Sequence, residues 1–247
     1  MFRGPFALLA MLVAALAISA CGGDDAPNTS GDLTASELAA KLPAGAIPQA
    51  VAVDVLAAKE AAGLAADTDP ISVGTNPNEL RFANSTFFAL FSLSAVIDNP
   101  VRTAMDNSQV TAYAAQPDYT SDAAVGLVST TQEFEDIASA LEDEGWTWDG
   151  DVLTGDSDEQ GLTYDAVGAG DRFLVLGYSA ETVQAVASGE AEPSTSGEIE
   201  ALEELDAPVR GAIIPEVEGL ECVTLITFED FVDGKSIIFM SIDGEAD

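Results

Sequence analysis

The first 21 residues constrain most strongly where this chain folds. Arg3 precedes an apolar run from Phe6 to Ile18, which is too short to cross a bilayer because a spanning helix needs about 20 apolar residues. The run ends in the sequence ISAC at residues 18–21. A positive start, an apolar middle and small residues before a cleavage point are typical of an export signal. We therefore expect residues 1–20 to be a signal peptide, so that the rest of the chain folds outside the cytoplasm.

The end of this segment, Ile-Ser-Ala-Cys, resembles a bacterial lipobox. In a lipobox the cysteine is lipidated on sulfur and becomes the mature N-terminus, so we predict lipidation at Cys21. Several acyl chains on one cysteine hold a protein in a membrane more firmly than a single chain does. The membrane, reached through this lipid anchor, is therefore the first expected partner, and the expected location is the extracytoplasmic face of the cell membrane. An ordinary signal peptide or an uncleaved N-terminal anchor is the alternative.

Residues 21–32 are expected to form a flexible tether. The stretch after Cys21 reads GGDDAPNTSG and contains almost no side chain that can pack. Gly, Ser, Pro and Asp at this density favour a solvated, unstructured segment. The only other cysteine is Cys222, so a chain lipidated at Cys21 forms no intrachain disulfide. We expect Cys222 to be a small buried apolar residue in a strand rather than a reactive thiol.

The charge and the missing histidines exclude several functions. The chain has 43 Asp and Glu, 8 Lys and Arg, and no His, for a net charge of -35. Such a charge repels nucleic acid, so no nucleic-acid partner is expected. Without His there is no Ser-His-Asp or Cys-His nucleophile and no His-ligated metal site. A pair of carboxylates could still act as acid and base, but nothing singles out a buried pair. We therefore expect no enzyme activity, no cofactor and no resident metal.

The acidic excess itself has two interpretations. It can keep an extracytoplasmic protein soluble and adapted to salt, or it can form an electrostatic face for a cationic partner. Composition does not separate the two.

From Leu33 onward, helix and strand signals alternate. Thr34 with Glu37 predicts a capping box at the start of a helix, and Thr130 with Glu133 predicts a second one. In the second helix, positions 134, 137, 138 and 141 are apolar at i, i+3, i+4 and i+7, which indicates an amphipathic helix lying on a sheet. Further helices are expected near residues 56–62, 77–97, 180–188 and 198–205.

Strand signals occupy most of the remaining chain. Short apolar stretches separated by Gly, Asp and Pro are expected to be strands at residues 50–55, 110–115, 123–129, 146–148, 152–154, 162–167, 172–177, 209–214, 223–228 and 236–242. Runs of strands with helices between them predict an α+β fold: a mainly antiparallel sheet with helices packed on one face. We assign this domain to residues 33–247. The polar, Pro- and Ser-containing stretch at 190–197 is either a surface loop or a subdomain junction.

An acidic, Gly-containing stretch follows the amphipathic helix. Asp149, Asp151, Asp156 and Asp158 lie close together in sequence, and calcium prefers several oxygen ligands on a bendable loop. The spacing does not match an EF-hand loop, because Val152 and Leu153 stand where further oxygens are needed. A solvated acidic turn is the favoured interpretation, and weak cation binding is the alternative.

The expected helix at residues 77–97 is apolar around nearly its whole circumference. Phe87, Phe88 and Phe91 contribute most of its aromatic surface. Such a helix is either buried on several sides or presents apolar surface to a ligand or partner. A central core helix is favoured. A surface for an apolar ligand or a protein partner is the alternative.

Four stretches resemble an uncharacterised lipoprotein family of high-GC actinobacteria. They read LPAGAI at residues 42–47, AVAVD at 50–54, AAVGLVST at 123–130 and RFLVLGYS at 172–179. The resemblance covers most of the mature chain. It implies a surface-anchored α+β module of unknown function, and it brings no catalytic residues with it.

These observations together predict a membrane-anchored lipoprotein. Its extracytoplasmic domain is expected to be a non-catalytic binding or interaction module for a protein or small-molecule ligand that the sequence does not identify. A carrier for a small apolar or lipid-like ligand, with the helix at 77–97 as a pocket wall, is the alternative function.

Overall fold

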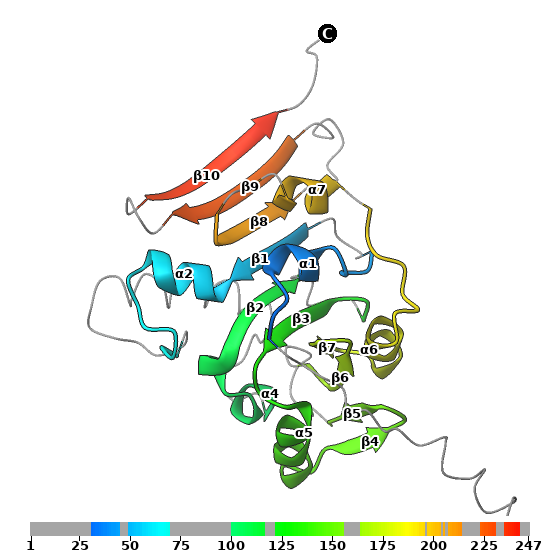
Figure 1. The fold of residues 1–247 in the computed structure, drawn as a ribbon. Coiled ribbons are helices and arrows are strands. Elements are labelled where there is room, and N and C mark those ends of the chain that lie inside the picture. Colours follow the sequence, from blue (N-terminus) through cyan, green and yellow to red (C-terminus); the bar gives the residue numbers. More distant parts are fainter. Residues whose placement is uncertain are drawn as a thin grey trace, which may run out of the picture.

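The computed structural model describes residues 31–44, 49–69, 100–116, 122–155, 164–195, 197–203, 205, 207–213, 223–230 and 235–242. The strands of these segments form one ten-stranded sheet in the order β10-β9-β8-β1-β2-β3-β7-β6-β5-β4, shown in Figure 1. Every neighbouring pair is antiparallel. The predicted class, α+β with an antiparallel sheet, is therefore confirmed.

The elements have the following bounds. The strands are β1 (Gln49–Asp54), β2 (Val110–Ala115), β3 (Val125–Thr130), β4 (Thr147–Asp149), β5 (Val152–Thr154), β6 (Ala166–Gly170), β7 (Phe173–Gly177), β8 (Val209–Ile213), β9 (Val223–Asp230) and β10 (Lys235–Ile242). The helices are α1 (Ala35–Ala39), α2 (Val55–Ala61), α4 (Pro100–Ala104), α5 (Phe134–Asp143), α6 (Ala180–Ala187) and α7 (Gly197–Glu203), with a 3-10 turn η1 (Asn107–Gln109) before β2.

Helices cover both faces of this sheet, which differs from the prediction that they pack on one face. In β2, Tyr113 and Ala115 belong to the core shared with α2, α4 and α5, as does Val110 on the far side of a register shift. Ala112 and Ala114 belong to a second core shared with α1, α6 and α7. Because successive side chains of a strand point to opposite faces, the two cores lie on opposite sides of the sheet. All six residues of β2 are consequently buried.

The start of α1 is confirmed, but the predicted capping box of α5 is wrong. At α1, the Thr34 side chain accepts from the Glu37 amide while the Glu37 side chain accepts from the Thr34 amide. At α5, the N-cap is Glu133 and it makes no side-chain cap hydrogen bond. Thr130 is still the last residue of β3, and its hydroxyl donates to the Gln109 carbonyl at 3.3 Å. The strand therefore continues through the residue that the pattern assigns to the cap.

The buried face of α5 agrees with the prediction. Phe134, Ile137, Ala138 and Leu141 are buried, whereas the acidic residues of its other face are exposed. The helix ends before Gly145, whose φ of +93° suits glycine.

Two backbone contacts connect the stretch at residues 190–195 to residues 42–43. The Ser194 amide donates to the Leu42 carbonyl at 2.7 Å, and Pro193 forms an isolated bridge with Pro43. After this stretch, β8 pairs with β1 in the same sheet. In the described part of the chain, no helix is long and apolar enough to span a membrane.

Candidate functional site

Gly31 is the first residue that the structure describes, and it lies two residues before the expected domain start. Gly31 has a φ of +65°, and a Cβ added there would lie 2.7 Å from Cγ2 and 2.9 Å from the amide nitrogen of Thr131. A residue with a side chain would be strained in this backbone conformation and would collide with its neighbour. Glycine therefore allows the last residues of the predicted tether to lie directly against the end of β3.

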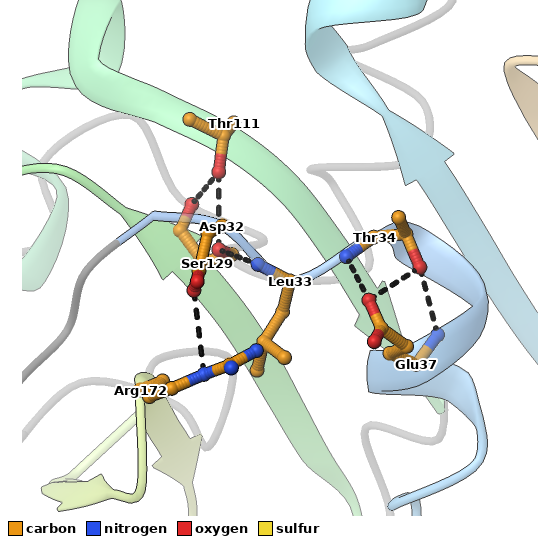
Figure 2. Close-up of polar contacts among 7 residues, drawn as sticks. All are labelled: Asp32, Leu33, Thr34, Glu37, Thr111, Ser129 and Arg172. Atoms are coloured by element: carbon orange, nitrogen blue, oxygen red, sulfur yellow. Dashed lines mark hydrogen bonds and ion pairs between the residues drawn. The ribbon is translucent and has the colours of Figure 1, made fainter.

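A buried set of hydrogen bonds holds the next residues to the sheet, as Figure 2 shows. The Leu33 amide donates to Ser129 Oγ at 3.3 Å. Thr111 Oγ1 lies 3.0 Å from Ser129 Oγ and 3.1 Å from the Ser129 carbonyl oxygen. Ser129 is fully buried and Leu33 is 7% exposed. The Thr111 hydroxyl is the donor to both Ser129 oxygens, and the Ser129 hydroxyl oxygen also accepts from the Leu33 amide.

Two exposed interactions flank this set (Figure 2). Arg172 Nε lies 3.3 Å from Asp32 Oδ1, and such a surface ion pair contributes only about 0–1 kcal/mol. On the other side, Glu37 Oε2 accepts from the amide and the hydroxyl of Thr34, both at 2.8 Å. These two hydrogen bonds stabilise the carboxylate and lower the pKa of Glu37. The junction between the predicted tether and the domain thus has one buried contact set and two solvent-exposed ones.

A groove lies close to this junction in the chain. It has a volume of about 430 Å³ and is lined from α5, β4, the β4–β5 turn, β6 and α6. Phe134, one of its lining residues, follows Thr131 by only three positions. The register pairs the end of β6 with the start of β7, and places the start of β5 opposite Gly168. The groove and the junction therefore occupy the same end of this part of the sheet.

Two aromatic rings form part of the groove wall. The rings of Phe134 and Trp148 have centroids 6.1 Å apart and are nearly perpendicular, at 88°. Phe134 is 5% exposed and belongs to the core, whereas Trp148 is 46% exposed. Trp148 Nε1 donates to Glu142 Oε1 at 3.0 Å, which orients the indole from α5. An edge-to-face pair of this kind is a stable arrangement for two aromatic rings.

The polar lining of the groove is acidic or neutral. Glu135 and Asp151 contribute carboxylates, Gln184 contributes an amide and Ser188 a hydroxyl, while three alanines supply the rest of the apolar surface. The nine residues that line the groove include no Lys or Arg. This arrangement can accept hydrogen bonds and hold a positive charge beside an aromatic surface.

The structure describes two of the four aspartates that the sequence grouped together. Asp149 ends β4 and Asp151 lies in the turn before β5, on either side of Gly150. Only Asp151 of these two lines the groove. Among the described residues, no group of three or more acidic or thiol side chains could hold a metal ion. Asp156 and Asp158 lie outside the described residues. The same is true of Cys21, Phe87, Phe88, Phe91 and Cys222, although strand β9 begins at the residue after Cys222.

A buried lysine, which the sequence did not single out, lies away from the groove in α2. Lys59 is 1% exposed. Its Nζ donates to the Ala66 carbonyl at 2.7 Å and to the Ser108 carbonyl at 3.3 Å. Burial lowers the pKa of Lys59, and three aspartates at positions 67, 69 and 106 oppose this shift. The contacts connect the segment after α2 to η1, which is a structural role.

Comparison with protein-family models, with curated proteins and with solved structures finds no match to this chain.

Proposed function

We propose that the chain is a membrane-anchored bacterial lipoprotein whose extracytoplasmic domain is a non-catalytic binding module. The observation that carries the proposal is the groove beside the point where the predicted tether joins the domain. An exposed aromatic ring with a few convergent polar groups is typical of a binding site. Membership of the actinobacterial lipoprotein family suggested by the sequence is part of the same proposal.

The tether length supports a location close to the membrane. Nine residues separate Cys21 from Gly31, and a fully extended chain advances at most about 3.6 Å per residue. The junction at Gly31 therefore stays within roughly 35 Å of a lipidated Cys21. Because Gly31 is held against Thr131, the groove is kept near the bilayer surface, where a ligand arriving at the cell envelope would meet it.

The alternative of a carrier for an apolar ligand depends on Phe87, Phe88 and Phe91. These residues lie outside the described part of the chain. The groove is lined by two carboxylates, an amide and a hydroxyl as well as by apolar groups. A purely apolar or lipid-like ligand would leave those polar groups without partners, which carries a free-energy cost. The groove therefore favours a polar ligand over the carrier hypothesis.

Metabolic labelling with an alkyne analogue of palmitate tests the anchor. Full-length chain expressed in a bacterium is expected to lose residues 1–20, to take up the label and to sediment with membranes. The Cys21→Ala variant is expected to carry no label and to keep its signal segment. Cys222→Ala is the matched control, because it removes the other thiol and is expected to be labelled like the wild type. Labelling of Cys21→Ala at the wild-type level, or an unlabelled wild type, would refute the anchor.

A further inference from the structure

We infer that the groove binds a small organic cation, an ammonium group carried on a short apolar body. This inference rests on the proposed binding function and names the chemistry of its ligand. Three features of the groove carry it: the pair of aromatic rings, the sign of the lining charges and the volume.

The aromatic pair offers one exposed ring, Trp148, packed at a right angle against the buried ring of Phe134. Trp148 and Phe134 are inclined at 88° with centroids 6.1 Å apart, so the exposed indole stands as a wall beside the edge or face of the second ring. Cations bind to the faces of aromatic rings, most strongly to Trp, and aromatic walls of this kind recognise ammonium groups in proteins. The bond from Trp148 Nε1 to Glu142 fixes the indole in place, so little conformational freedom is lost when a ligand binds.

The charges of the lining favour the same ligand. Glu135 and Asp151 are the ionisable residues of the lining, and both are acidic. An anionic ligand would meet two carboxylates and an electron-rich ring, with no basic lining residue to compensate. An ammonium group gains attraction from both carboxylates and from the ring at once. Gln184 and Ser188 add a donor and acceptors for a hydroxyl or carbonyl on the ligand body.

The volume limits the size of the ligand. A groove of about 430 Å³ falls in the range of small-molecule sites, near its lower end. A free small cation fits a groove of this size, and it is the ligand that the inference names. A phosphocholine headgroup carries the same ammonium but also a phosphate, which the acidic lining disfavours.

Titration of the full-length chain in a neutral detergent, at about 150 mM salt to screen distant charges, tests the inference. The probes are choline, phosphocholine and 3,3-dimethylbutan-1-ol, which has the shape of choline without the charge. Ligand-observed NMR measures binding. We expect saturable binding of choline, with the uncharged alcohol at least about fivefold weaker because it lacks the cation–π and carboxylate attractions. Phosphocholine is expected to be weaker than choline.

Variants locate the binding. Trp148→Leu and Glu135→Gln are each expected to weaken choline binding by about threefold or more. Asp143→Asn is the matched control for Glu135→Gln, because it removes the same charge from the exposed face of the same helix without altering the groove. Circular dichroism checks that each variant is folded. Equal binding of choline and its uncharged analogue, absence of saturation, or equal effects of Asp143→Asn and Glu135→Gln would overturn the inference.

The two proposals can fail separately. Cys21→Ala is expected to bind choline like the wild type, since it leaves the groove intact. Choline binding without palmitate labelling would reject the anchor and keep the cation site. Labelling without choline binding would reject the cation site and keep the anchored binding module with a ligand of another class.

Discussion

The buried contact between the entering chain and the sheet gives a prediction whose size follows from the structure. Ser129 Oγ accepts from the Leu33 amide at 3.3 Å and pairs with Thr111 Oγ1 at 3.0 Å. Ser129→Ala removes both interactions and leaves the Leu33 amide without that acceptor at a position only 7% exposed. Burying a donor without a partner costs about 1–3 kcal/mol, and an ordinary hydrogen bond contributes about 1 kcal/mol. We expect Ser129→Ala to lower the free energy of unfolding by about 2–3 kcal/mol.

Thr111→Val is the matched comparison. It removes the partner hydroxyl from the neighbouring strand and keeps the side-chain shape, but the bond from Leu33 to Ser129 remains. We expect it to cost about 1 kcal/mol. Urea denaturation measures both variants, with the fluorescence of the buried Trp146 as the probe. Hydrogen exchange is expected to show faster exchange of the Leu33 amide in Ser129→Ala only.

Two results would contradict this reasoning. Equal destabilisation by Ser129→Ala and Thr111→Val would mean that the Leu33 amide gains nothing from its acceptor. Unchanged exchange at Leu33 in Ser129→Ala would mean that the entering segment is held by its buried side chain alone.

Three further predictions concern charge and backbone conformation. Burial lowers the pKa of Lys59, so between that lowered value and about 10.4 the unfolded chain binds more protons than the folded chain, and stability rises with pH. Lys59→Met is expected to lack this rise in urea midpoints from pH 8 to 10. Parallel pH dependences of the wild type and the variant would contradict the prediction. Gly31→Ala places a side chain at a φ of +65° beside Thr131 and is expected to lower stability by about 1–2 kcal/mol from its backbone conformation alone, so an unchanged urea midpoint would refute it. Arg172 also has a positive φ, 70°. Arg172→Gly and Arg172→Ala both lose the ion pair with Asp32, but the glycine variant is expected to be more stable by about 1 kcal/mol in urea, because glycine adopts a positive φ without strain. Equal stabilities of the two variants would show that the turn carries no strain.

Local patterns predicted the elements well, because their causes lie within a few residues. The apolar spacing of α5 gives its buried face, and the Thr34–Glu37 pair gives the start of α1. The error at Thr130 has a non-local cause. That residue pairs with Val110 across the sheet, and this pairing extends the strand into the expected cap.

The sequence did contain a signal that helices cover both faces of the sheet, but it is a continuous apolar run and not an alternation of apolar and polar residues. A strand buried on both faces reads as a nearly continuous apolar run, and β2, with the sequence VTAYAA, is buried at all six positions. The groove had no comparable signal. Its walls come from α5 and α6, which are about forty residues apart, and Trp148 differs from the buried Trp146 only in what the rest of the fold places over it.

The structure also sharpens the question of why the chain is so acidic. On α5, Glu135, Asp136, Glu142 and Asp143 are all exposed, yet only Glu135 lines the groove. Glu135 therefore takes part in the candidate site directly and Glu142 through its hydrogen bond to Trp148, whereas Asp136 and Asp143 do not line the groove. At physiological salt, charges further than about 8 Å from a bound cation are largely screened. A recognition role for the acidic excess consequently predicts unequal effects of Glu135→Gln and Asp143→Asn on cation binding, whereas a general attraction by the net charge of -35 predicts equal and small ones.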